Sequence, residues 1–222
     1  MKSKILFIAP HPDDETLGCG GTILKHKKKG DDIYWLIITS MQVNSTYSKS
    51  AVEIRKKEIE EVSGLYGFKE IFQLDHLPSS LDAIPKKDLI NDIIKVINHI
   101  KPETIYLPHF GDVHSDHRII FDAVIACTKS FRNKDIKNLI AYETVSETEF
   151  NVKGKSSAFV PNLWIDIEEF LDKKVEIMNT YKSEILDHPF PRSEKNVVSL
   201  SSVRGSNVGL KVAESFMILK EI

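Results

Sequence analysis

The amino-acid sequence predicts an α/β fold, a Rossmann-like three-layer sandwich with a mostly parallel central sheet. Short apolar runs, typical of buried strands, alternate along the chain with longer segments whose apolar residues recur at helical spacing. Glycines cluster directly after the first apolar run, where a helix would begin. Charged and polar residues follow several of the strands, as expected at the carboxyl edge of a parallel sheet, where ligands bind.

The first half of the chain predicts regular strand–helix units. Continuous apolar runs predict strands at residues 4–9, 32–39, 71–74 and 104–108. Helical periodicity predicts helices at about 16–29, 52–66, 86–100 and 115–130. Gly18, Gly20 and Gly21 would let the first helix approach the first strand and a ligand closely, and Gly30 would end that helix.

The second half of the chain is less regular. Strands are predicted at 139–142, 163–167 and 213–219, with one helix at 168–181. Two polar segments remain open: 40–50 is either a lid or a plain connection, and 186–203 either closes over a pocket or mediates assembly. Since no long linker or repeat divides the 222 residues, we expect a single domain over 1–222.

Composition excludes several classes of protein. The chain is 41% hydrophobic and 28% charged, with a formal net charge of −2, which favours neither nucleic acid nor an anionic membrane as partner. No apolar run approaches the roughly 18 residues of a membrane span, and no signal peptide is recognisable. Cys19 and Cys127 are interpreted as buried fillers, and a cytoplasmic location is expected.

A histidine and three acids follow the first strand. His11 and Asp14 are three residues apart, close enough to face one ion, and Asp13 and Glu15 flank Asp14. Adjacent carboxylates repel one another unless a cation or a proton offsets their charge. This turn therefore predicts half of a metal site.

The other half is predicted after the strand at 104–108. His114 and His117 are again three residues apart, and Asp112 and Asp116 accompany them. Two histidines and one carboxylate with an open position form a ligand set of zinc hydrolases. A histidine pair in a loop is commonly solvated surface, but here both clusters follow strands of one parallel sheet, which brings them together.

These motifs carry a family resemblance. The chain resembles the PIG-L/LmbE-like N-acetylglucosamine deacetylases over nearly its whole length. The matching segments are Pro10-His11-Pro12-Asp13-Asp14-Glu15, Asp112-x-His114-x-Asp116-His117, Arg55-x-x-Glu58, residues 174–183, Arg204-Gly205 and Ala213-Glu214-Ser215-Phe216. The two histidine motifs are specific, whereas the C-terminal matches alone would be weak.

The residues suggest metal ligands and a base. We assign His11, Asp14 and His117 as ligands, in agreement with the resemblance, and His109 is a rival ligand. A coordinating carboxylate cannot also serve as a free base, so Asp13 is the candidate general base. In the alternative, Asp13 caps the following helix and Glu15 is the base.

Further roles are assigned around these ligands. His114 would donate a proton to the oxyanion or to the leaving amine, with Asp116 raising its pKa towards neutrality. Asp112 would either orient a ligand or contact substrate. The helical pattern alone predicts a solvated Arg55, but the resemblance implies that Arg55 contacts substrate hydroxyls.

The sequence thus favours a metal-dependent hydrolase that removes the N-acetyl group of an N-acetylglucosamine-like sugar or conjugate and releases acetate. The expected cofactor is Zn²⁺, with Fe²⁺ as an alternative. An Fe(II) oxygenase uses a similar ligand triad, and a non-catalytic carbohydrate- or metal-binding module is the alternative from another class. The sequence does not identify the sugar, and the resemblance leaves a homo-oligomer open.

Overall fold

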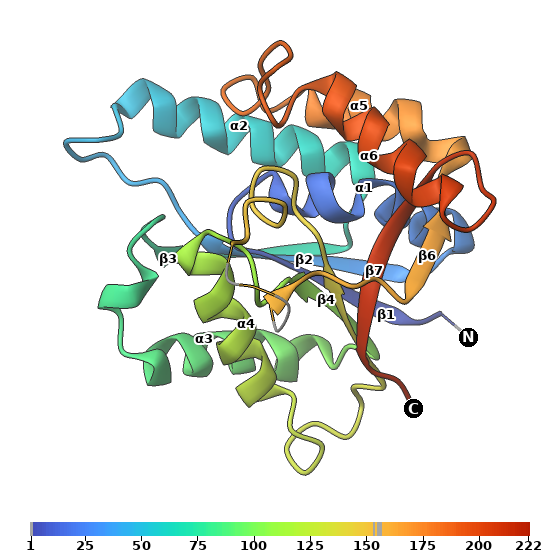
Figure 1. Cartoon of the computed structure of the whole chain (residues 1–222). Helices are drawn as coiled ribbons and strands as arrows, with labels where there is room; N and C mark the ends of the chain where they lie inside the picture. The colour runs from blue at the N-terminus through green and yellow to red at the C-terminus, as the bar shows by residue number, and fades with distance from the viewer. Residues whose placement is uncertain (1, 153, 155–156) are drawn as a thin grey trace.

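The computed structural model describes residues 2–152, 154 and 157–222, and it confirms the α/β class. Seven strands form one sheet in the order β3-β2-β1-β4-β5-β7-β6 (Figure 1). The strands are β1 Lys4–Ala9, β2 Asp32–Thr39, β3 Glu70–His76, β4 Thr104–Pro108, β5 Asn138–Tyr142, β6 Leu163–Asp166 and β7 Ala213–Lys220. β1 to β5 run parallel, and β7 is antiparallel to both of its neighbours, β5 and β6.

Helices cover both faces of the sheet and complete the three layers (Figure 1). They are α1 Asp14–Lys29, α2 Lys49–Tyr66, α3 Lys86–Ile100, α4 Ser115–Cys127, α5 Leu171–Met178 and α6 Glu194–Ser206. α1, α2, α5 and α6 pack on one face, and α3 and α4 pack on the other. None of the helices in the described part of the chain has the length and apolar character needed to cross a membrane.

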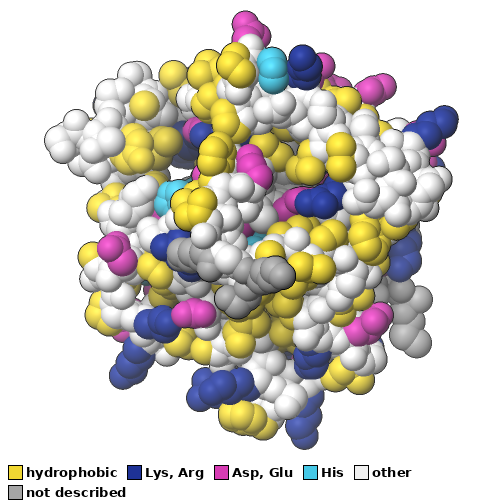
Figure 2. Space-filling model, in the orientation of Figure 1, with side chains coloured by type: hydrophobic (Ala, Val, Ile, Leu, Met, Phe, Trp, Pro, Cys, Tyr) yellow, Lys and Arg dark blue, Asp and Glu magenta, His cyan; other side chains and the backbone are white. Residues whose placement is uncertain are grey.

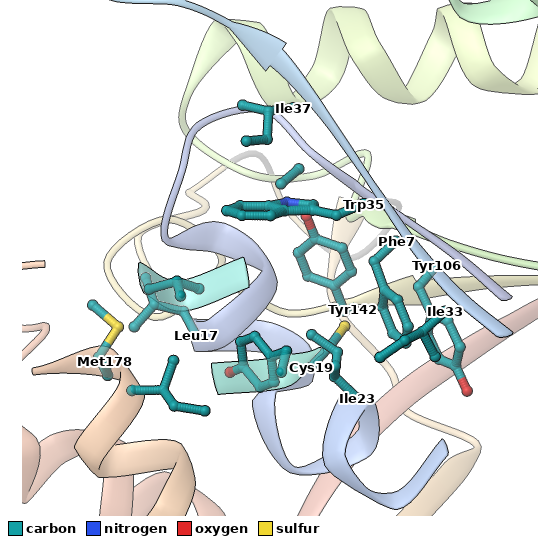
Figure 3. Close-up of a cluster of buried hydrophobic side chains, with 14 of the residues drawn as sticks. Phe7, Leu17, Cys19, Ile23, Ile33, Trp35, Ile37, Tyr106, Tyr142 and Met178 are labelled. Carbon is teal, nitrogen blue, oxygen red and sulfur yellow. The ribbon is translucent and has the colours of Figure 1, made fainter. Parts of the chain in front are cut away.

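Two apolar cores form because the central strands are buried on both faces. In β1, Phe7 faces the core under α1 while Leu6 and Ile8 face the core under α3 and α4. The first core is aromatic around Phe7. The Phe7 ring stacks on the Tyr106 ring of β4, with 4.8 Å between the ring centroids (Figure 3). Trp35 of β2 lies in the same cluster and is fully buried. A continuous apolar strand is what a parallel sheet covered on both sides requires.

Helix α1 lies very close to the sheet. A Cβ atom on Gly18 would lie 2.3 Å from the Tyr142 ring and 2.9 Å from the Glu143 carbonyl oxygen, so only glycine fits there. At Gly18 the predicted close approach therefore exists, but it is made to the end of β5 rather than to β1.

A buried ion pair between Glu214 and Lys174 binds backbone groups of α1. The Glu214 carboxylate of β7 accepts the N–H groups of Gly21 and Thr22, both at 2.8 Å. Lys174 of α5 donates to Glu214 at 2.7 Å and to the Leu17 carbonyl at 2.9 Å. These contacts fix the helix that begins at the predicted metal site.

Two elements differ from the sequence prediction. The helix expected at 168–181 is a 3-10 turn at Glu168–Phe170 followed by the shorter α5. The segment 186–203, expected to be a polar loop, contains most of α6, which begins after Ser193 and is capped by that side chain. Its four serines and sparse apolar residues give a weak helical pattern, so tertiary contacts with β7 decide its structure.

On the face shown in Figure 2, Lys and Arg side chains are interspersed with acidic and apolar ones.

Candidate metal centre

The two predicted halves of the site meet at the carboxyl edge of the sheet. β1 and β4 are adjacent parallel strands, so the turn after Ala9 and the segment after Pro108 lie side by side. The strand order reverses between β1 and β4, and such switch points are where open α/β sheets bind ligands.

His11, Asp14 and His117 converge on one point. Their donor atoms all lie within 4.8 Å of one another. Asp14 Oδ2 is 3.3 Å from His11 Nδ1 and 3.3 Å from His117 Nε2. The imidazole Nε2 of His117 is buried and has no hydrogen-bond partner among the described residues. An orphaned imidazole nitrogen beside a carboxylate and a second imidazole fits a divalent metal ion.

Without a metal, the pKa values of Asp14, His11 and His117 are shifted by the attraction between the carboxylate and the two imidazoles. Burial alone would raise the pKa of Asp14, but the charges and hydrogen bonds of His117 and His11 hold it well below its usual range. Burial lowers the pKa of His11, but hydrogen bonds to Asp116 and Asp14 outweigh it and raise the pKa to about 9. The pKa of His117 is also raised, against the effect of burial, by Asp14 and Asp112. A metal ion would have to displace these protons.

Two further carboxylates orient the two histidines. Asp112 Oδ2 lies 2.8 Å from His117 Nδ1, and both side chains are fully buried. Asp116 Oδ2 lies 3.0 Å from His11 Nε2 and accepts the N–H of Ser79 at 2.7 Å. Carboxylates that hold the second ring nitrogen of a ligating histidine fix its tautomer and orientation. Asp112 therefore faces His117 and is not among the residues that line the pocket in front of the donors. This favours the orienting role of the two that were predicted for it.

The environment of His114 differs from the expectation. The Asp116 carboxylate does not bond its ring; instead His114 Nδ1 accepts the backbone N–H of Asp116 at the start of α4. Burial, together with the charges of His11 and His117, lowers the pKa of His114 to about 4. The charge of Asp116 does raise the pKa of His114, as predicted, but burial and the two histidine charges outweigh it. The Asp116 carboxylate is itself held by His11 and by the N–H groups of Ser79 and Leu81. With Nδ1 acting as acceptor, the proton of neutral His114 is on Nε2.

Asp13 stands next to the convergent donors without joining them. Its side chain is 4% exposed, and burial and the neighbouring Asp14 raise its pKa well above the usual range. Its side chain makes no helix-capping hydrogen bond, so the capping alternative is not supported. Glu15 is fully buried, where it accepts hydrogen bonds from Thr16 and Tyr181, and it does not line the pocket.

Two rivals to this ligand set are the predicted alternative ligand His109 and a second group of possible donors. His109 is buried and its Nδ1 accepts the Gly111 N–H, so it stays outside the convergent group. A second set of possible donors, His11, His114 and Asp116, shares His11. The first set is better suited to an ion because its buried His117 Nε2 makes no hydrogen bond among the described residues and only a 3.3 Å contact with Asp14 of the same set. In the second set His11 Nε2 is hydrogen-bonded to Asp116 at 3.0 Å.

A pocket of about 200 Å³ opens in front of these residues. Arg55 lines it but is 5% exposed, because it donates to the Pro12 carbonyl and pairs with Glu184. Residues that sequence reasoning missed complete the wall: Met41, Tyr47, Glu147, Glu184 and Arg192. Met41 and Tyr47 come from 40–50, predicted as either a lid or a plain connection, and Arg192 comes from 186–203, predicted to close over a pocket or mediate assembly. No motif marked these residues individually.

Comparison with known proteins follows this geometry. The family model "PIG-L: GlcNAc-PI de-N-acetylase" matches residues 6–128, more than half of the chain. Diacetylchitobiose deacetylase of Thermococcus kodakarensis is 26% identical over 99% of this chain and 84% of its own length. A probable N-acetyl-alpha-D-glucosaminyl L-malate deacetylase 2 of Bacillus cereus is 25% identical over 83% of this chain and 84% of its own.

A solved structure shares the fold. The N,N'-diacetylchitobiose deacetylase of Pyrococcus horikoshii, in complex with an inhibitor, superposes with a TM-score of 0.77 at 24% identity. The match covers 98% of this chain and 84% of the other. These comparisons confirm the resemblance that the two histidine motifs indicated.

Proposed function

This chain belongs to the PIG-L family, and we propose on that basis that it is a metal-dependent hydrolase that removes the acetyl group from an N-acetylglucosamine-like sugar or sugar conjugate. The observation that carries the proposal is the convergence of His11, Asp14 and His117, with the separate carboxylate of Asp13 beside them in one pocket. The curated relatives, whose names describe deacetylases of N-acetylated amino sugars, support this substrate class.

His11, Asp14 and His117 would hold the ion, with Asp112 and Asp116 orienting the two imidazoles. A divalent ion in this position, Zn²⁺ or Fe²⁺, would lower the pKa of a water molecule and polarise the acetamide carbonyl. The chain's own residues then have to take the water's proton, stabilise the developing negative charge and protonate the leaving nitrogen.

Asp13 is the group that takes the proton. It is buried beside the donors, its raised pKa suits a general base, and a base in this position contributes about 10²–10⁴-fold to the rate. His114, neutral and protonated on Nε2, donates a hydrogen bond to the carbonyl oxygen as charge develops there. Because the low pKa of His114 makes it a poor source of a second proton, Asp13 returns its proton to the nitrogen as the C–N bond breaks, which yields acetate and the free amine.

Arg55 would contact a sugar hydroxyl, as the family resemblance implies, with the one Nη1 hydrogen that its partners among the described residues leave free. The segments 40–50 and 186–203 border the pocket through Met41, Tyr47 and Arg192, which supports a role for both as its covers. The two cysteines are unpaired and buried, in keeping with a reducing compartment, and we place the enzyme in the cytosol.

The experiment is a screen of N-acetylated sugars, neutral and anionic, for acetate release by the metal-loaded protein. A chelator should abolish release, and Zn²⁺ or Fe²⁺ should restore it. The Fe(II) oxygenase alternative predicts O₂ consumption without acetate. A binding module would retain sugar through long incubation with no product, and either result would refute the proposal.

A further inference from the structure

The carboxylate of Asp13 has a single side-chain partner. Arg192 Nη1 donates to its Oδ2 at 3.0 Å, whereas Oδ1 has no partner among the residues that the structure describes. The side chain is almost fully buried next to Asp14, whose negative charge repels it. An interaction that fixes which oxygen faces the water would therefore have a direct effect on a base at this position.

The backbone of Asp13 is fixed by other contacts. Its φ angle is +137°, a conformation that few non-glycine residues adopt, and its N–H donates to Glu15 Oε2 at 3.1 Å. Its carbonyl oxygen accepts the N–H groups of Thr16 and Leu17 in the first turn of α1. Glu15 is in turn held by the Tyr181 hydroxyl at 2.9 Å. Rotation of the Asp13 side chain is thus the freedom that remains, and Arg192 is what restrains it.

Arg192 is itself anchored from two sides. Its Nη1 is 3.2 Å from Glu184 Oε2, and the other oxygen of Glu184 pairs with Arg55. Its guanidinium lies 5.6 Å from the centroid of the Phe190 ring. The result is a row of alternating charges that runs from α2 to the turn after β1: Glu58, Arg55, Glu184, Arg192 and Asp13. An arginine held this way presents its donors in a defined direction, which a flexible lysine does not.

We propose that Arg192 is a positioning residue for the general base: it holds Oδ2 of Asp13 and leaves Oδ1 to take the proton of the attacking water. This inference rests on the proposed function, because it assigns the base the task that hydrolysis requires. Arg192 acts through Asp13 and is 179 residues away from it in the sequence, so no local motif indicates the pairing.

The test compares zinc-loaded Arg192→Met and Arg192→Lys with the zinc-loaded wild-type enzyme. The substrate is an N-acetylglucosaminide identified in the acetate-release screen. Displacement of a catalytic group by about 1 Å costs on the order of 10²-fold, so kcat of Arg192→Met should fall by about that factor with KM and zinc content unchanged. Millimolar guanidinium should restore part of kcat in Arg192→Met and none in Asp13→Asn. Arg192→Lys should lie between. Arg132→Met, at an exposed arginine that does not line the pocket, is the matched control.

Crystal structures of the zinc-loaded wild type and Arg192→Met provide a readout that does not depend on activity. The proposal expects a rotated Asp13 carboxylate in the variant, and an unchanged orientation would overturn it. It is equally overturned by unchanged kcat, or by a raised KM alone, which would make Arg192 a substrate contact. If the wild type releases no acetate, the proposed function fails while the two structures still decide the role of Arg192. Should Arg192→Met not fold, Arg192→Gln replaces it.

Discussion

Replacing Asp112 with asparagine should weaken metal binding without changing the ligands. Asp112 Oδ2 lies 2.8 Å from His117 Nδ1, and neither side chain is more than 1% exposed. Burial would raise the pKa of Asp112, but hydrogen bonds to His109 and His117 hold it below its usual range, so the residue is ionised at neutral pH. Asparagine keeps the size and an acceptor oxygen but removes the charge that makes His117 a stronger donor to the metal.

The magnitude follows from what such outer carboxylates contribute. Their loss typically costs 10- to 100-fold in metal affinity, or about 1.4–2.8 kcal/mol at roughly 1.4 kcal/mol per tenfold change. The zinc Kd would be measured by competition with a chromogenic chelator at neutral pH. Asp122→Asn is the matched control, since Asp122 lies on α4, the helix that carries His117, but is exposed and pairs with the exposed Lys86. If the two variants bind zinc equally well, the assignment of His117 as an Asp112-supported ligand is refuted.

Three other expectations follow. Asp13→Asn should retain zinc and lose about 10²–10⁴-fold in kcat. Full turnover in a stopped acetate assay would show that Asp13 is not the general base. Because the metal-free pKa of His11 is raised to about 9, zinc affinity should increase as pH rises from 6.5 to 9, and chelator-buffered titrations that show no such increase would contradict it. Lys174→Met leaves the buried Glu214 without its cation and should reduce the free energy of unfolding by about 3–5 kcal/mol in urea denaturation; a loss below about 1 kcal/mol would argue against it.

The parallel half of the fold was predictable because its signals are local. A strand buried on both faces must be continuously apolar, as β1 and β2 are, and a helix that covers one face must show a stripe, as α3 does. α6 was not predicted, because its pattern is weak and its position depends on packing against a strand that follows it. The antiparallel end of the sheet, where β7 pairs with β5 and with the edge strand β6, likewise depends on pairing between distant segments.

The convergent donors were predictable for a different reason. His11 with Asp14, and His114 with His117, show ligand spacing within single turns after strands, and parallel pairing of β1 with β4 brings the turns together. The pairing of Asp116 with His11 instead of His114 could not be read from adjacency, since it depends on how α4 directs each side chain. Arg192 was missed because its partner is at the other end of the chain.

The contacts of Glu214 also join α1 to a distant segment of the chain. Glu214 lies on β7, and its carboxylate accepts the N–H groups of Gly21 and Thr22, which lie 193 and 192 positions away in the sequence. The position of α1, and with it the turn that carries His11 and Asp14, therefore depends on a strand remote in the sequence. A change that displaces β7 would reach the candidate metal centre through this helix.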